Sequence, residues 1–327
     1  MVLHHPHGGP RFPLCLATSI SLLLFSVAVK SQQKEPVDVI SVRTDLVAVP
    51  FSVTDSHGRR ISNLNQMDFA LTDDGRANKI DYFASGAERI ALAFVLDNSG
   101  SLREQLSRQR DAAIGLFRRF GPASSVAVIW FGQSAKLVEP FTRETENAGA
   151  AFNLPTSLSE RTAIFDAALL AVKAYADRSE NSPERRIAIL ISDGLDTASK
   201  VSSQQVIAAA NHANVSFYVI QLPLFTPIDG RLTARPASKG FRELAEKTGG
   251  KYFVAGTSAL ALNTSARVDL TQVFAAIEDD LRSQYMIGFY PGDAARDGRP
   301  HRVSVSPSNR KLKVHQLRTS YSLRPGP

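Results

Sequence analysis

The sequence predicts an α/β protein with a doubly wound, mostly parallel sheet and a small additional β-sandwich-like module. The prediction rests first on residues 90–96, a continuous apolar run that ends at Asp97. Such a run suits a strand covered on both faces better than a half-exposed strand, in which apolar and polar residues alternate. A second strand-like run, 186–192, ends at Asp193, and helix-like segments lie between and after the two runs. Before residue 88 the runs are short and alternating, as in antiparallel strands.

Residues 1–31 are predicted to be a secretory signal peptide. Arg11 precedes the apolar segment 12–29, and Val29-Lys30-Ser31 offers small residues at the spacing that a signal peptidase uses. The segment is also about long enough to span a bilayer, so an uncleaved membrane anchor is the alternative. No second stretch approaches that length, and we therefore expect a secreted or periplasmic protein with no membrane span after cleavage. The single cysteine, Cys15, lies in this segment, so no disulfide is expected in the mature chain.

Residues 32–87 are expected to form the small β module. Strand-like runs cover 39–44 and 46–53, and a further hairpin is expected from 69–72 through an Asp-Asp-Gly turn to 80–83. The acids of that turn are interpreted as turn residues and not as metal ligands. The C-terminal tail, 291–327, alternates in the same way from residue 301 onward. We therefore expect the tail to return and pack beside the N-terminal module.

Residues 88–290 are expected to form the α/β domain. A helix should follow Asp97 over 102–120, because Gly121-Pro122 ends its apolar periodicity. The segment 222–236, which contains three prolines, is expected to be a surface loop or an insertion. Alternating elements of these lengths predict right-handed crossovers with helices on both faces of the sheet. The remaining predicted elements are strands at 125–131, 215–222, 251–254 and 285–290, and helices from 162 onward, at 203–212, at 239–248 and at 270–281.

The composition fits an ordinary globular protein. The chain has 327 residues, of which 43% are hydrophobic and 21% charged, enough for one large domain and a smaller one. Its formal charge of +7 is spread along the chain. Nucleic-acid binding calls for a basic stripe with stacking aromatic residues, so no nucleic-acid partner is expected.

Oxygen-bearing side chains follow the two buried strands. Asp97, Ser99 and Ser101 lie at the end of the first strand, Asp193 ends the second, and Thr162 opens a helix. In parallel sheets the carboxyl ends of the strands share one edge, where ligands bind. An oxygen-only donor set suits a hard divalent cation, Mg²⁺ or Mn²⁺ with Ca²⁺ as a further option. Taken alone, the Asp97 segment also fits a turn and helix N-cap.

These segments resemble a known family. Residues 94–101 resemble the metal-ion-dependent adhesion site (MIDAS) motif of von Willebrand factor type A (VWFA) domains, 162–167 resemble its threonine loop, and 191–194 its aspartate loop. The resemblance covers roughly 88–290 and implies a Rossmann-like fold. It also implies a metal site with hydroxyl and carboxylate ligands at Asp97, Ser99, Ser101, Thr162 and Asp193. Together with the N-terminal module, the chain is similar to exported bacterial proteins described as VWFA-related, a group without an assigned biochemical activity.

The function that the resemblance implies is metal-dependent protein binding or adhesion, in which the cation recruits an acidic residue of a partner protein. Where the family often has glycine before the threonine, this chain has Glu160-Arg161, and a guanidinium beside the cation would repel it unless Glu160 compensates. The alternative is a structural or scaffold protein that has a degenerate metal site and binds through its β module.

No enzymatic activity is expected. A hydrolase would use Ser99 as its nucleophile, and the nucleophile would need a base. No motif places a histidine beside Ser99; the candidates after the signal peptide are His57, His212, His301 and His315.

Overall fold

The computed structural model describes residues 46–86, 89–100, 102–155, 161–176, 178, 184–258, 262 and 268–323. All of them belong to the second of two compact units, 1–43 and 44–327. The predicted signal peptide, the strand expected at 39–44, Ser101 and Glu160 lie outside the described residues. Within the described ranges, no helix combines the length and the apolar character needed to cross a membrane.

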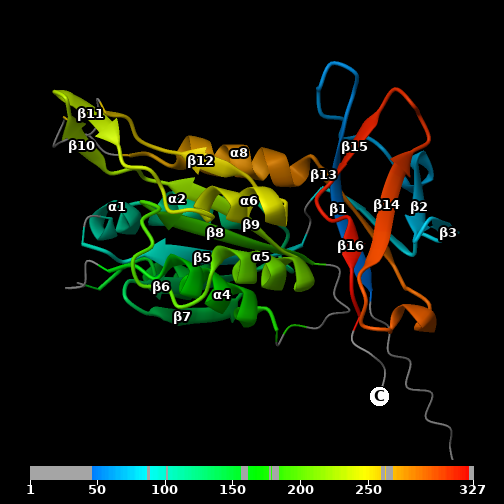
Figure 1. Ribbon diagram of the computed structural model, residues 1–327, viewed down its shortest axis with the longest axis horizontal. Helices are drawn as coiled ribbons and strands as arrows, with labels where there is room; N and C mark the ends of the chain where they lie inside the picture. The colour runs from blue at the N-terminus through cyan, green and yellow to red at the C-terminus, as the bar shows by residue number, and fades with distance from the viewer. Residues whose placement is uncertain are drawn as a thin grey trace, which may run out of the picture. The chain divides into compact units, whose positions relative to one another are not determined.

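A six-stranded sheet forms the centre of the α/β domain (Figure 1). Its order is β12-β9-β8-β5-β6-β7, and every neighbouring pair is parallel except β6 with β7. The two predicted apolar strands, β5 (Ile90–Asp97) and β8 (Arg185–Ser192), lie side by side in its middle, which confirms the predicted parallel sheet. The other strands are β6 (Ser125–Phe131), β7 (Ala135–Thr142), β9 (Val215–Gln221) and β12 (Tyr252–Val254).

Alternating side chains of β5 enter two hydrophobic cores, one on each face of the sheet. Leu92 and Phe94 belong to one core, whereas Ala93 and Val95 belong to the other. This division confirms the doubly wound architecture. Helices α1 (Arg103–Ser107), α2 (Arg110–Arg118), α3 (Thr145–Ala150) and α8 (Thr271–Arg282) cover the first core, and α4 (Ile164–Ala174), α5 (Ser203–His212) and α6 (Phe241–Thr248) cover the second.

Three elements of the domain differ from the predictions. The single helix expected over 102–120 is divided into α1 and α2. The edge strand β7 was not expected, and Pro140 within it suits an edge position because proline cannot donate to a neighbouring strand. The segment expected as a loop contains a hairpin of β10 (Phe225–Ile228) and β11 (Arg231–Ala234). Its turn, Asp229-Gly230, has φ values of 48° and 72°, as a two-residue hairpin turn requires.

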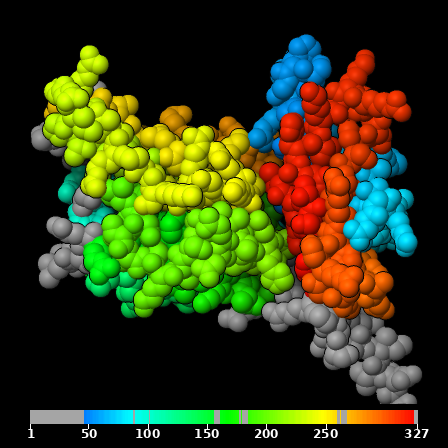
Figure 2. Space-filling model, in the orientation of Figure 1, coloured from blue at the N-terminus to red at the C-terminus, as the bar shows by residue number. Residues whose placement is uncertain are grey.

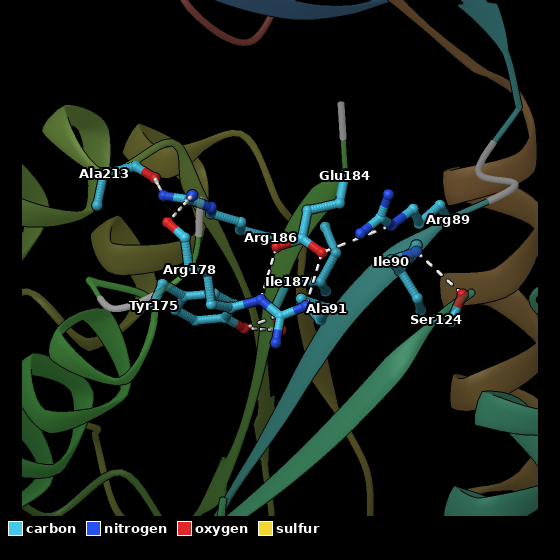
Figure 3. Close-up of polar contacts among 10 residues, drawn as sticks. All are labelled: Arg89, Ile90, Ala91, Ser124, Tyr175, Arg178, Glu184, Arg186, Ile187 and Ala213. Carbon is cyan, nitrogen blue, oxygen red and sulfur yellow. Dashed lines mark hydrogen bonds and ion pairs between the residues drawn. The ribbon is translucent and has the colours of Figure 1, made fainter. Parts of the chain in front are cut away.

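A polar network joins α4 to the amino ends of β5 and β8 (Figure 3). Glu184, buried just before β8, accepts hydrogen bonds from Arg178 Nε at 2.6 Å and Nη2 at 2.7 Å. The hydroxyl of Tyr175 donates to the carbonyl oxygens of Ile187, at 2.6 Å, and Ala91, at 3.2 Å. The network satisfies polar groups that the crossover from α4 to β8 buries.

Two four-stranded antiparallel sheets form the β module, in the orders β15-β1-β13-β4 and β16-β14-β2-β3. They share a core in which the ring of Phe51 lies 4.9 Å from that of Phe69 and 5.5 Å from that of Tyr285. Strand β14 pairs with β2, and β15 with β1, which confirms that the tail packs with the N-terminal module. The strands are β1 (Val47–Thr54), β2 (Phe69–Asp73), β3 (Arg76–Asn78), β4 (Tyr82–Ser85), β13 (Gln284–Phe289), β14 (His301–Pro307), β15 (Lys313–Gln316) and β16 (Ser320–Tyr321).

Two pairings in the module correct the predictions. Strand β2 forms its hairpin with β3 and not with 80–83, because Asp74 and Gly75, with φ of 46° and 78°, make a two-residue turn whose return strand begins at once. Strand β4 instead pairs with β13 in the other sheet. Strand β13, expected at the end of the α/β segment, belongs to the β module because alternate residues such as Ile287 and Phe289 are buried in its core.

Candidate metal centre

The four described residues of the predicted donor set lie at the carboxyl edge of the central sheet. Because β5 and β8 pair in parallel, with Leu96 opposite Ile191, their ends bring Asp97 and Asp193 to one edge. All four side chains are buried, with exposed fractions of 0% for Asp97, 6% for Ser99, 3% for Thr162 and 6% for Asp193. The remaining candidate, Ser101, lies outside the described residues.

Asp97 is held by hydrogen bonds to both of its carboxylate oxygens. Its Oδ1 accepts from the backbone N–H of Ser99 at 2.9 Å, and its Oδ2 accepts from Ser192 Oγ at 2.7 Å. Ser192 Oγ in turn accepts from the N–H of Gly194 at 3.1 Å. Ser192 was not among the predicted site residues, because its only signal in the sequence is a polar residue at the end of an otherwise apolar strand. The hydroxyl therefore links the ends of β5 and β8.

The loop of Thr162 is joined to the loop that follows Asp193. Thr162 Oγ1 donates to the carbonyl oxygen of Leu195, and Thr162 N donates to Thr197 Oγ1 at 2.9 Å. The carbonyl oxygen of Thr162 accepts from Thr197 N at 2.8 Å. These contacts place the hydroxyl of Thr162 beside the aspartate loop, as the resemblance implied.

Asp196 supports the same arrangement without belonging to the donor set. Its Oδ1 accepts from the backbone N–H of Ile164 at 2.8 Å and from Ser199 Oγ. An acid that accepts from an amide in the first turn of α4 satisfies one of the unpaired amides at a helix start. Sequence reasoning could not assign this role, because the acid and the helix it supports are 32 residues apart.

The charged forms of Asp97 and Asp193 are costly to bury in the absence of a compensating positive charge. Burial, and to a smaller extent the nearby charge of Asp193, raise the pKa of Asp97 to about 6, although the hydrogen bonds from the Ser192 hydroxyl and the Ser99 N–H act to lower it. Burial also raises the pKa of Asp193, whereas the N–H of Leu195 and the charge of Arg235 lower it. A dication between the two acids would remove this cost.

Two buried oxygens at the site have no hydrogen-bond partner: Ser99 Oγ and Asn98 Oδ1. Leaving a buried polar atom unpaired is costly, so such atoms are typical of positions where a water or an ion binds. No group of three or more His, Cys, Asp or Glu side chains in the described ranges is placed to hold a metal. A cation at this edge would accordingly depend on hydroxyl as well as carboxylate oxygens, the ligands that Mg²⁺ and Ca²⁺ prefer. The residues present fit such a cation.

Arg161, the residue that departs from the family pattern, is exposed beside the site. Its Nη2 lies 3.5 Å from the carbonyl oxygen of Thr197, on the loop that follows Asp193. The guanidinium therefore adds positive charge near the cation position.

The histidines that follow the predicted signal peptide lie away from Ser99. His57, His301 and His315 contact residues of the β module. His212 is exposed in the last turn of α5, the helix that leads from the site edge of β8 to the start of β9.

Comparison with known proteins gives one family. The model of the von Willebrand factor type A domain matches residues 91–266, more than half of the 327 residues. No curated protein matches the chain.

Three solved structures are among those to which the chain is similar. An aerotolerance-related membrane protein from Bacteroides fragilis NCTC 9343 is 19% identical, covering 59% of this chain and 98% of its own, with a TM-score of 0.43. BatB from Bacteroides thetaiotaomicron is 18% identical, covering 58% and 99%, with a TM-score of 0.41. Proximal thread matrix protein 1 from the mussel byssus, with a zinc-occupied MIDAS motif, is 15% identical, covering 63% and 48%, with a TM-score of 0.45.

Proposed function

Since the chain belongs to the von Willebrand factor type A domain family, we propose that it is an exported protein-binding or adhesion module that depends on a divalent cation. The cation, Mg²⁺ in the first instance with Mn²⁺ or Ca²⁺ as alternatives, recruits an acidic residue of a partner protein. The observation that carries the proposal is the buried, unpartnered hydroxyl of Ser99 beside two buried carboxylates. The residues that would hold the cation are Asp97, Ser99, Ser101, Thr162 and Asp193.

The donor chemistry leads from a bound cation to partner binding. Two carboxylates neutralise a dication, and the hydroxyls complete only part of an octahedral shell, so a position remains for water or an external ligand. A carboxylate is the protein group that best replaces that water, because hard cations prefer charged oxygen ligands. When bound, the cation supplies this coordination, while the loops of Ser99, Thr162 and Asp193 keep the protein oxygens in place.

Calorimetric titration of Mg²⁺, Mn²⁺ and Ca²⁺ into the purified protein tests the proposal. We expect binding heat from the wild type and little or none from Asp97→Asn, which keeps the size of the side chain and removes its charge. Asp229→Asn is the matched control, since Asp229 is an exposed acid in a left-handed turn position that asparagine also tolerates. Equal heats from wild type and Asp97→Asn would place the cation elsewhere.

A scaffold that binds through its β module is the second candidate. It is favoured by the two sheets of the β module, which have a core of their own, and by Arg161, which departs from the family pattern beside the metal site. A partner captured equally well in Mg²⁺ and in a chelator would support this candidate over metal-dependent binding.

We further propose that the protein acts by binding and not by catalysis. The contacts of the histidines in the β module and the position of His212 support this, since a serine nucleophile needs a neighbouring base. Labelling of Ser99 by an active-serine probe would contradict it.

Export is proposed from the composition of residues 12–29. Fractionation of the source cells and sequencing of the mature N-terminus test it. A mature chain that begins near residue 32 in the secreted or periplasmic fraction is expected, and a chain that keeps the segment in the membrane fraction would favour an uncleaved anchor.

A further inference from the structure

The hairpin β10–β11 begins and ends at the loop that carries Asp193. Gln221, the last residue of β9, donates through Nε2 to the carbonyl oxygen of Asp193 at 3.0 Å. After the hairpin, Ser238 N donates to the carbonyl oxygen of Gly194 at 2.8 Å. Figure 1 shows the hairpin at the same end of the α/β domain as α1, which follows the Asp97 loop. In Figure 2 it forms a yellow-green protrusion at the upper left. The hairpin thus stands beside the candidate metal centre.

Four exposed cationic residues lie on segments attached to that centre, and we call them the basic rim: Arg161, Lys200, Arg235 and Lys239. Arg161 precedes the donor Thr162, and Lys200 lies on the loop that follows Asp193. Arg235 follows β11 and closes the base of the hairpin, where its backbone N–H donates to Leu224 at 2.8 Å. Lys239 follows Ser238, which contacts the Asp193 loop directly. Each rim residue therefore comes from a segment attached to the site.

Two nearby acids, Asp166 and Asp196, are not among the proposed cation ligands and accept hydrogen bonds from backbone N–H groups. Asp166 Oδ1 accepts from the N–H groups of Lys200 and Val201, at 2.9 and 3.1 Å, and Asp196 accepts from α4. Lys200 and Lys239 form no ion pair with another described residue, whereas the charge of Arg235 acts on Asp193, whose pKa it lowers. Asp166 and Asp196 keep their negative charges, but the four cations of the rim outnumber these two acids, so the rim adds positive potential to the charge of a bound cation.

We propose that the basic rim selects an acidic segment of the partner protein, with several neighbouring carboxylates. One carboxylate binds the cation, and those beside it pair with Arg235, Lys239, Lys200 and Arg161. The inference rests on the proposed function and names the partner chemistry that the cation alone does not specify. Exposed ion pairs add little affinity each, but charges around an interface speed association and exclude partners of like charge.

Two labelled peptides of equal length provide the test, one with four consecutive aspartates and one with a single aspartate among asparagines. In saturating Mg²⁺ at low salt, we expect the four-aspartate peptide to associate roughly tenfold faster, and the advantage to shrink as salt shortens the Debye length. Arg235→Gln should lower the affinity for the four-aspartate peptide by about two- to fivefold, as expected for the loss of one exposed ion pair. Arg231→Gln, at the tip of the same hairpin, is the matched control and should retain the preference.

Calorimetry of Mg²⁺ on the same variants separates this inference from the proposed function. Removing a positive charge near the cation should leave Mg²⁺ affinity equal or higher in Arg235→Gln. If wild type binds Mg²⁺ but both peptides associate equally, the rim inference is wrong and the cation site stands. If the four-aspartate peptide is preferred in a chelator and Mg²⁺ gives no heat, the rim binds acids but the proposed cation function fails. An oligothymidine that binds as tightly as the four-aspartate peptide would overturn the assignment to a protein partner.

Discussion

Two buried serines of the α/β domain differ in what their hydroxyl oxygens contact. Ser99 is 6% exposed, and its Oγ has no partner. Ser124 is 2% exposed, and its Oγ accepts from the N–H of Ile90 at 3.0 Å. In the cation-free protein the hydroxyl of Ser99 lowers the stability of the fold, because burying a polar group without a hydrogen bond is unfavourable. The hydroxyl of Ser124 raises the stability, because its buried hydrogen bond is made.

The two serines should respond oppositely to alanine. Without a divalent cation, Ser99→Ala should raise the free energy of unfolding by up to about 1 kcal/mol, and Ser124→Ala should lower it by about 1 kcal/mol. In saturating Mg²⁺, Ser99→Ala should lose the stabilisation that a bound cation gives the wild type. Urea denaturation with and without Mg²⁺ measures all of these values. A Ser99→Ala protein that is less stable without the cation and gains as much from Mg²⁺ as the wild type would show that the hydroxyl is structural.

His301 is held between two acids in the β module. Its Nδ1 lies 2.8 Å from Asp74 Oδ2, and its Nε2 lies 3.0 Å from Asp297 Oδ1. Both ring nitrogens donate only when the imidazole is protonated. The hydrogen bond to Asp74, and then that to Asp297, raises the pKa of His301, and the pKa values of both acids are lowered. The three groups therefore stabilise one another in their charged forms.

The contribution of His301 should depend on pH. Because its folded-state pKa is raised, its stabilisation is fully present below the unfolded value of about 6.5 and is lost as pH rises through the folded value. His301→Gln should therefore cost more stability near pH 6 than near pH 9, as measured by urea denaturation. Below about pH 4 the acids become protonated and the difference should shrink again. An equal cost at pH 6 and pH 9 would contradict the charged pairing.

At the start of β8 the buried acid Glu184 pairs closely with Arg178 and, at 3.8 Å, with Arg89. Glu184 has a side chain 1% exposed, and its partner Arg178 is 21% exposed. Glu184→Ala should lower the free energy of unfolding by about 3 kcal/mol, because it leaves a largely buried guanidinium without its partner. Glu104→Ala is the control: Glu104 is 72% exposed, and losing its pair with Arg108 should cost at most about 1 kcal/mol. Thermal or urea unfolding measures both, and similar losses would mean that the Glu184 pair contributes no more than a surface pair.

The elements that the sequence predicts well are those whose pattern depends on burial alone. β5 and β8 are apolar because both faces of the sheet are covered, so their positions and their carboxyl ends could be found without a structure. β7 and the hairpin β10–β11 lie at or beyond the edge of the sheet, where exposed residues weaken the pattern. The pairing of β4 with β13 joins residues about 200 positions apart, and no local signal specifies it.

The same distinction holds at the candidate metal centre. Asp97, Ser99, Thr162 and Asp193 could be proposed because acids and hydroxyls at strand ends and a helix start have a recognisable spacing. Ser192 could not be proposed, and the proximity of Asp196 to Asp193 in the sequence did not specify its contacts, since both residues act through contacts to other elements. The basic rim could not be predicted for the same reason, because its four residues come from separate segments and share no motif.

Asp280, near the end of α8, joins the α/β domain to the β module. Its Oδ2 accepts from Tyr218 at 2.6 Å and from Gln284 at 2.7 Å. Its Oδ1 pairs with Lys251 at 2.5 Å and with Arg60, which lies in the loop after β1. One buried carboxylate thus contacts residues from both parts of the described chain.

Replacing this carboxylate should weaken the connection between the two parts. Asp280→Asn should lower the free energy of unfolding by about 2 to 4 kcal/mol, since it leaves two cations without their counter-charge. Asp279→Asn changes the neighbouring exposed acid and should have little effect. Trp130, the only tryptophan, reports on the α/β domain by fluorescence, while circular dichroism reports on both parts. We expect the two signals to coincide in the wild type and to separate in Asp280→Asn; coincident, unshifted transitions would contradict a coupling role.

The pairing of β4 with β13 gives the α/β domain the topology of a cassette inserted into a β hairpin. Ser85 lies opposite Tyr285, and Gly86 N donates to Gln284 O at 2.8 Å, so the chain leaves the β module and re-enters it at adjacent backbone positions. A two-residue turn joins antiparallel strands at this separation. Replacing residues 87–283 by an Asn-Gly turn would therefore leave the strand order of both β sheets unchanged. In evolutionary terms, the α/β domain can be exchanged without redesigning the β module into which it is inserted.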